Sequence, residues 1–245
     1  MGVLVFVSGA AVMIYEFIAV RMLQRFFGSS LEVWSAEISI CLLGLAAGYS
    51  LGGCLADRFR SWAPLGIVWC IAGFSALFME PVVVWTAAYI AGGEMMRWWE
   101  PLVASAAATL LPLIALGTVM PQAIRLAVTQ MEKLGSGAGR VAALSTLGSI
   151  CGTLVTSSLF VQWGVRESLY ATCATLIAGG VVIVLTCLAY RRASASAASA
   201  MLVVMGASLC AQHATAQTIY EDYSAYHHIL VHDEDDKRIL YFDSS

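Results

Sequence analysis

The chain has 245 residues, of which 60% are hydrophobic and only 12% are charged, and its formal net charge at pH 7 is -3. Soluble domains carry about 25% charged residues, so this composition excludes an ordinary soluble domain and indicates an integral membrane protein. The small net charge, without a basic patch interleaved with aromatic residues, argues against nucleic-acid binding.

Seven apolar runs follow one another along the chain, and a run of about 20 residues can cross a bilayer core about 30 Å thick. The predicted spans are residues 3–26, 31–56, 65–91, 102–128, 141–161, 168–190 and 198–216. Glycine, serine and proline residues separate them, including the cluster from Gly135 to Gly139. The sequence therefore predicts an all-α integral membrane protein.

The second span carries a glycine at every fourth position, namely Gly44, Gly48 and Gly52. On a helix this spacing leaves one face without side chains, so that another helix can approach to backbone contact. Gly148 and Gly152 repeat the same spacing in the fifth span. We expect both faces to be helix-packing sites.

Lysine and arginine residues near the span ends indicate the orientation. With the N-terminus in the cytoplasm, the inner side receives Arg58, Arg60, Arg125, Lys133, Arg140, Arg191 and Arg192, and the outer side receives Arg25, Arg97 and Arg166. This distribution favours a cytoplasmic N-terminus in a bacterial-type inner (plasma) membrane. Seven spans then place the C-terminal tail in the periplasm or outside the cell.

The chain changes character after the sixth span, so we divide it into three parts. Residues 1–197 form a six-helix membrane domain, and residues 218–245 form a polar, aromatic tail that alternates like an extramembrane β-hairpin. Residues 198–217, between them, form either a seventh transmembrane helix or a signal-like segment cleaved after Ala216. A lone hairpin is marginally stable in water, so the tail requires a partner or more of a domain.

Charged residues inside membrane spans are costly and are candidates for function. Glu16 and Arg21 lie in the first span, Glu37 in the second and Glu80 in the third. These four residues define a possible intramembrane polar site on a substrate or ion path. Structural pairing between helices, with Arg21 neutralising a glutamate, is the alternative.

Proline residues make two of the predicted spans irregular. Pro81 follows Glu80 and is expected to kink or open the third span. Pro112 and Pro121 lie in the fourth span, where a freed backbone carbonyl either binds a ligand or accompanies a packing kink.

No pattern of residues indicates a catalytic centre, a cofactor or a metal site. The seven cysteines all lie in apolar stretches without a C-x-x-C pair, so we expect buried small side chains. His228 and His232 would share a face of a strand, but a solvated hairpin explains them better than metal binding. Phosphate-loop, dinucleotide-binding and hydrolase motifs do not occur.

Several stretches, in order, resemble membrane-bound spermidine synthase-like proteins, in which a multi-helix membrane part precedes an aminopropyltransferase-like domain. The stretches are Ser8–Glu16 with Arg21, Gly44–Arg58, Leu116–Arg125, Gly139–Gly152, and Ser224–Ile229 with Arg238–Asp243. The last pair is similar to the first hairpin of the synthase domain. The family's cofactor-binding and catalytic positions follow that hairpin, so none is carried over to this chain. Gly53–Arg60 is also similar, more loosely, to the loop between helices two and three of major facilitator transporters.

Three functions remain open at this stage. The first is a non-catalytic membrane anchor or scaffold subunit that supports an exported domain or a partner complex. The second is the N-terminal part of a membrane-bound aminopropyltransferase, and the third is a small-solute or polyamine transporter-like protein. Expected partners are the lipid bilayer and either another protein or further copies of this chain, but no nucleic acid.

Overall fold

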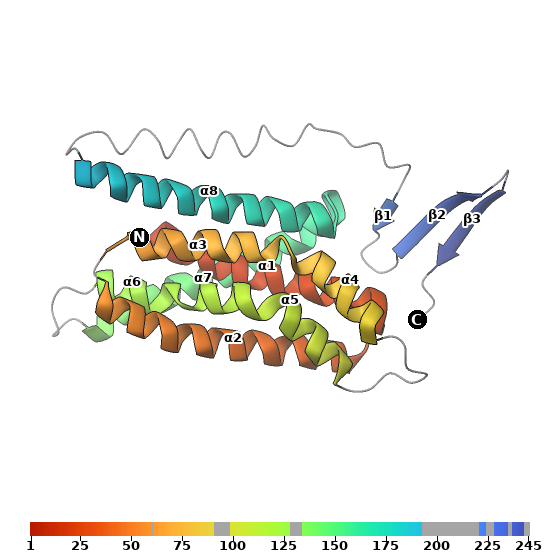
Figure 1. The fold of residues 1–245 in the computed structure, drawn as a ribbon, viewed down its shortest axis with the longest axis horizontal. Coiled ribbons are helices and arrows are strands. Elements are labelled where there is room, and N and C mark those ends of the chain that lie inside the picture. The colour runs from red at the N-terminus through yellow and green to blue at the C-terminus, as the bar shows by residue number, and fades with distance from the viewer. Residues whose placement is uncertain are drawn as a thin grey trace.

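The computed structural model describes residues 1–59, 61–90, 99–127, 134–192, 221–223, 228–234 and 237–242. The helices lie side by side along the long axis of one bundle (Figure 1). Within the described ranges, five helices are long and apolar enough to cross a membrane, or six if a bent pair counts as one span. The predicted span at residues 198–216 lies outside the described residues.

The first two helices form an N-terminal hairpin. Helix α1 (Gly2–Phe27) ends at Gly28, whose φ of 74° is a left-handed conformation that glycine adopts without strain. Helix α2 (Leu31–Arg58) begins after Ser30, whose hydroxyl oxygen accepts a hydrogen bond of 3.4 Å from the backbone N–H of Val33. This side-chain cap satisfies one of the free donors at the helix start.

The third predicted span is bent, and the fourth departs from regular helix only at Thr118, whose φ of -66° and ψ of -18° remain in the helical region. Helices α3 (Ala63–Ala76) and α4 (Met79–Ile90) form a pair bent by 43°. Helix α5 (Glu100–Gly117) is followed by α6 (Val119–Ala127), and together they form one candidate span. Pro81 and Pro121 have no N–H for the carbonyls of Leu77 and Gly117. Leu77 lies in the first break, and Gly117 directly precedes the second, at Thr118.

The last two helices are continuous. Helix α7 spans Leu134–Gln162 and helix α8 spans Val165–Arg192, and Gly164 with φ 87° separates them. The expectation that Gly135–Gly139 separates two spans is wrong, because these residues lie inside α7. A helical glycine costs about 1 kcal/mol relative to alanine, and this long helix accommodates the three glycines of the cluster.

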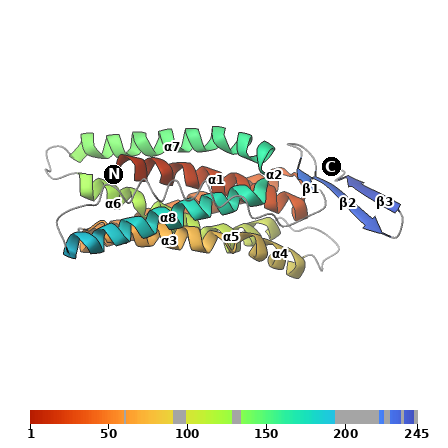
Figure 2. The ribbon, with the colours of Figure 1, turned by 90° about the horizontal axis from the view of Figure 1, so that it is seen from above.

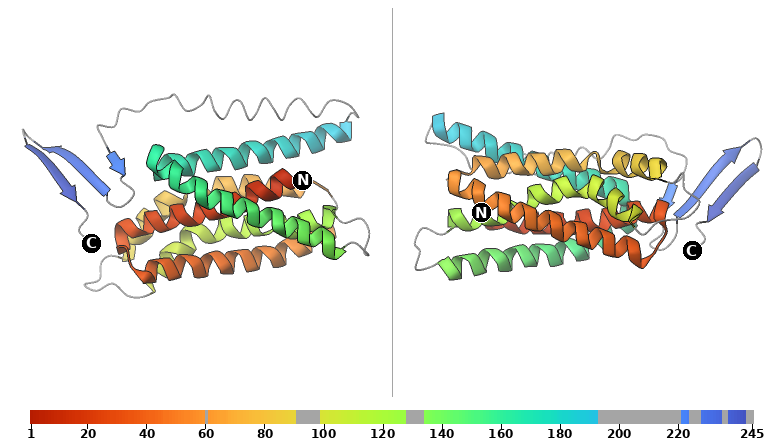
Figure 3. Two further views of the ribbon diagram at one scale, coloured as in Figure 1. Left: turned by 180° about the vertical axis from the view of Figure 1, so that it is seen from behind. Right: turned by 60° about the horizontal axis from the view of Figure 1, so that its bottom comes forward.

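Helix α1 occupies the centre of the bundle and packs against α2, α4, α5, α6, α7 and α8, and its Ser8 accepts a hydrogen bond from Trp69 of α3. Tyr15, Ile18 and Leu23 on this helix are completely buried. Three pairs pack most extensively: α1 with α7, α2 with α5, and α3 with α8. Figure 2 shows α7 along α1 on one flank of the bundle, and Figure 3 shows the same pair from behind.

Outward-facing positions of the bundle are largely apolar. On α2, Leu42 is 63% exposed and Leu43 is 57% exposed, and Trp85 and Tyr89 of α4 are also exposed. Such side chains fit contact with lipid tails. The helices are thus compatible with a multi-pass membrane protein in a bilayer.

Three short strands lie in the C-terminal part of the chain: β1 (Glu221–Tyr223), β2 (His228–Glu234) and β3 (Lys237–Phe242). They form an antiparallel sheet in the order β1-β2-β3, in which Leu230 faces Glu221 on one side and Tyr241 on the other.

Candidate functional site

The glycine faces lie at the closest helix contacts of the bundle. A Cβ atom at Gly44 would lie 2.9 Å from the Cβ of Leu113, and one at Gly52 would lie 2.6 Å from the Cα of Thr118. Gly48 lies between them, against Gly117. Helix α2 therefore packs on α5 and the start of α6 with its backbone almost in contact.

The second glycine face packs in the same way against α1. A Cβ at Gly148 would lie 2.8 Å from the carbonyl carbon of Phe6, and one at Gly152 would lie 2.6 Å from the carbonyl oxygen of Ala10. The Ser149 hydroxyl, between these glycines, donates a hydrogen bond of 3.1 Å to the carbonyl oxygen of Gly9.

Two of the four predicted charged residues come together, and both belong to the outer half of the bundle in the predicted orientation. Glu37 is completely buried between α2 and α5, and the Ser105 hydroxyl donates to its Oε2 atom at 2.5 Å. Its other oxygen, Oε1, has no hydrogen-bond partner among the described residues. The Glu16 carboxylate of α1 is close enough to Glu37 to interact electrostatically.

Cys41 and Thr109 complete this group. The Cys41 thiol, one helical turn after Glu37, donates to Glu16 Oε2 at 3.7 Å. The Thr109 hydroxyl, one turn after Ser105, also lies beside the Glu37 carboxylate. We call these five residues, Glu16, Glu37, Cys41, Ser105 and Thr109, the carboxylate cluster.

The other two predicted charged residues do not join the carboxylate cluster. Glu80 of α4 forms an ion pair with Arg166 of α8, with 2.8 Å between Oε2 and Nε. Arg21 is half-buried and has interactions of its own, but it is not among the groups that act on either carboxylate. The four residues therefore do not form one continuous polar site.

A cavity of about 60 Å³ lies between α1, α2, α7 and the junction of α5 with α6. Since one water needs about 10–15 Å³ of such space, the cavity has room for about four to six waters. Its lining combines small, hydroxyl and apolar side chains: Val5, Ser8, Gly9, Val12, Leu45, Tyr49, Leu116, Gly117, Val119, Met120, Ser145 and Ser149.

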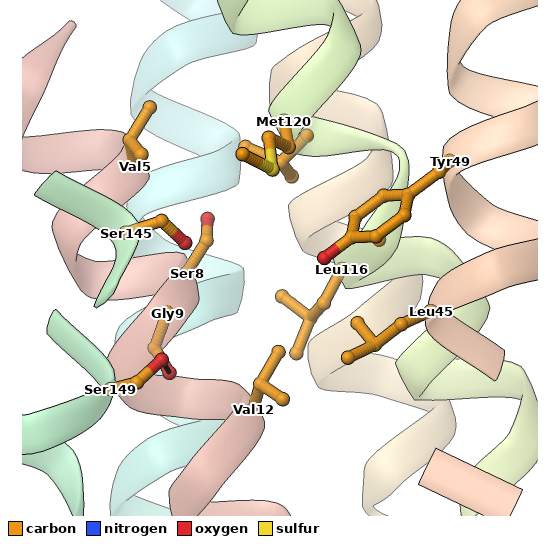
Figure 4. Close-up of a pocket in the computed structure, with 12 residues that line it drawn as sticks. Val5, Ser8, Gly9, Val12, Leu45, Tyr49, Leu116, Met120, Ser145 and Ser149 are labelled. Atoms are coloured by element: carbon orange, nitrogen blue, oxygen red, sulfur yellow. Dashed lines mark hydrogen bonds between the residues drawn. The ribbon is translucent and has the colours of Figure 1, made fainter. Parts of the chain in front are cut away.

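Hydroxyl groups converge on this cavity from two sides (Figure 4). The Tyr49 hydroxyl points into it from α2, and the hydroxyls of Ser8 and Ser145 lie on the opposite side. Ser8 is held in place because it accepts a hydrogen bond of 2.8 Å from Trp69 Nε1 and donates one of 2.8 Å to the Leu4 carbonyl. We call this space the hydroxyl-lined cavity.

The sequence does not identify most of the uncharged residues that form the carboxylate cluster and the hydroxyl-lined cavity. The sequence predicts only a small buried side chain at Cys41 and indicates no role for Ser105, Thr109 or Tyr49. One signal was present, because Ser105 and Thr109 share a helix face in an otherwise apolar span.

Comparison of the chain with models of known protein families, with curated proteins and with solved structures finds no match.

Proposed function

We propose that this chain is a multi-pass membrane protein of the transporter-like class, in which the hydroxyl-lined cavity binds a small polar solute. The observation that carries this proposal is the position of the cavity at the break between α5 and α6. There Pro121 supplies no N–H for the Gly117 carbonyl, and Gly117 lines the cavity. Local losses of backbone hydrogen bonding in membrane helices can form solute sites because they present backbone polar groups.

The chemistry of the cavity suits a solute that forms hydrogen bonds rather than an apolar one. Ser8, Tyr49, Ser145 and Ser149 present hydroxyl groups, while Val12, Leu45 and Leu116 provide the apolar surface around them. The carboxylate cluster lies one helical turn away and favours a cationic or proton-linked solute over an anionic one. This supports the transporter-like interpretation of the sequence.

Uptake into proteoliposomes tests this function. The purified chain is reconstituted and assayed with radiolabelled probes of three classes: a diamine, an amino acid and a monosaccharide. We expect uptake of at least one class above that of empty liposomes. Tyr49→Phe should weaken the apparent affinity for the transported probe about 2–10-fold, since a net hydrogen bond is worth about 0.5–1.5 kcal/mol.

Tyr89→Phe is the matched control, because Tyr89 is 80% exposed on α4 and does not line the cavity. It should leave uptake unchanged. Uptake equal to that of empty liposomes for every probe, or an equal effect of both substitutions, contradicts the proposed function.

The second candidate is the non-catalytic anchor or scaffold, related to spermidine synthase-like membrane proteins. It is favoured by the three closely packed helix pairs, which make a rigid support. In this proposal the bundle is completed by a seventh span, and the tail is an extramembrane β-hairpin outside the cytoplasm that contacts a partner. A purified chain that is monodisperse and has a folded tail without any partner would contradict it. The aminopropyltransferase interpretation stays a prediction.

A further inference from the structure

Glu37 carries an ionisable carboxyl group, but its buried position disfavours the ionised form. Its side chain has no exposed surface, it lies within a transmembrane helix, and its Oε1 atom is unpartnered among the described residues. An ionised carboxylate without a counter-charge in such surroundings costs several kcal/mol, and the group becomes neutral instead. The structure thus favours a carboxyl group that takes up a proton.

The second carboxylate strengthens this argument. Glu16, which is half-buried, interacts electrostatically with the buried Glu37, and two such neighbouring carboxylates cannot both be ionised at low cost. The pair therefore tends to hold one proton between two groups. Cys41 touches Glu16, the Ser105 hydroxyl donates to Glu37, and the Thr109 hydroxyl, which donates to the Ser105 carbonyl, lies beside Glu37. Neutral hydrogen-bonding groups therefore surround the shared proton.

Among the described residues, the charged groups of the neighbouring elements are not among those that act on the pair. They are Arg21 and Arg25 on α1, Glu32 on α2, Glu100 on α5, Glu80 on α4, and Arg166 and Glu167 on α8. Glu80 and Arg166 pair with each other, and Arg21 and Arg25 have interactions of their own. The groups that act on Glu16 and Glu37 are the other members of the carboxylate cluster.

The carboxylate cluster and the hydroxyl-lined cavity lie on the same helix faces. Val12 and Leu45 line the cavity, and Glu16 and Cys41 lie four residues from them on α1 and α2. Four residues of a helix correspond to about 6 Å along its axis. A proton released by the cluster therefore has to pass only one helical turn to reach the cavity.

A proton is the cation that this arrangement fits best. Among the described residues, no three His, Cys, Asp or Glu side chains lie close enough to hold a metal ion. The residues that line the cavity do not include Glu16, Cys41 or Glu37. A proton requires neither several ligands nor a cavity, and one vacant carboxylate oxygen is enough.

We propose that Glu16 and Glu37 form an intramembrane proton-binding site that exchanges protons with the hydroxyl-lined cavity and couples solute movement to them. Binding converts one carboxylate of the pair and one proton into a neutral carboxylic acid, and release reverses this step. The proton site stands on the cluster alone, whereas the coupling rests on the proposed transport function.

Infrared difference spectroscopy tests the proton site without reference to transport. The full chain is labelled with ¹³C-glutamate and reconstituted in lipid nanodiscs, and its spectra in acidic and in basic buffer are subtracted. We expect the C=O stretch of a protonated, buried glutamic acid with a shift in D₂O. Glu37→Gln should abolish this band, and Glu16→Gln should move it.

Glu32→Gln is the matched control, because Glu32 is exposed in the first turn of the same helix. It should leave the band unchanged. Glutamine retains the shape of glutamate and an acceptor for Ser105, so Glu37→Gln is expected to fold, which the melting profile checks. A wild-type spectrum without the band, or an identical band in Glu37→Gln, overturns the proposal.

A second measurement addresses coupling. An inward proton gradient imposed on proteoliposomes should accelerate uptake of the transported probe several-fold in the wild-type chain but not in Glu37→Gln. An uptake rate that does not change with the proton gradient overturns the proposed coupling. If the wild-type chain carries no probe, the transport function fails, and the infrared band still decides whether the proton site exists.

Discussion

The effect of a glycine-to-alanine substitution on stability depends on which atoms lie where the new Cβ would be. Gly148 of α7 faces the backbone of Phe6, whereas Gly139 of the same helix has no atom within 4 Å of the place where a Cβ would be. Both residues are helical, so their intrinsic propensities are alike. The difference between them is entirely one of packing.

We therefore expect Gly148→Ala and Gly139→Ala to change stability in opposite directions. Gly148→Ala forces α7 away from α1 and should cost about 1–3 kcal/mol, the usual range for overpacking. Gly139→Ala should be neutral or stabilise the chain by up to about 1 kcal/mol, because alanine is the better helix former. Thermal unfolding of both variants in one detergent measures this, and equal melting temperatures would contradict the packing argument.

The predictions for single residues were correct where the sequence pattern of one helix was enough to make them. The spacing of Gly44, Gly48 and Gly52 predicted a close helix contact, and α5 and α6 lie there. Glu16 and Glu37 were both candidates for a polar site, but nothing in the sequence indicated that α5 brings Ser105 to Glu37. Periodicity defines the faces of each helix and does not specify which faces meet.

Proline determines where two of the predicted spans are interrupted. The sequence predicted irregular helices near Pro81 and Pro121, and each interruption includes or directly follows the residue whose carbonyl the proline cannot pair. Pro112 lies inside α5, which continues through it. A proline therefore indicates a possible break, and the packing of neighbouring helices decides whether the break opens.

Replacing Pro81 tests this account at the level of one element. Pro81→Ala restores an N–H that can bond to the Leu77 carbonyl, so the 43° bend between α3 and α4 should decrease. Hydrogen exchange measured by mass spectrometry should become slower in the peptide that covers residues 77–86. Pro64→Ala is the control, because Pro64 lies in the first turn of α3, where no intrahelical bond is missing. Faster exchange in Pro81→Ala would contradict the assignment of the bend to proline.

Helix directions connect the packed pairs to the topology of the whole molecule. Gly2 meets Leu144 and Gly148 meets Phe6, so α1 and α7 run parallel. Gly66 meets Gly180 and Gly73 meets Cys173, so α3 and α8 run antiparallel. These directions agree with six spans in which α3 with α4, and α5 with α6, each cross the membrane once. The sequence predicted this order of spans, but it could not predict that the packed pairs join helices far apart in the chain.

Both ends of a six-span bundle lie on one side of the membrane, and one more span at residues 198–216 would carry the tail to the other side. The arginine and lysine distribution places the first side in the cytoplasm. Reporter fusions measure this arrangement: green fluorescent protein fused after Arg192 should fluoresce, and alkaline phosphatase fused after Ser245 should be active. A phosphatase fusion after Ser30, in the first outer loop, should also be active and calibrates the assay. Fluorescence of a fusion after Ser245 would instead place the tail in the cytoplasm, remove the seventh span from the topology, and leave the scaffold proposal without its exported tail.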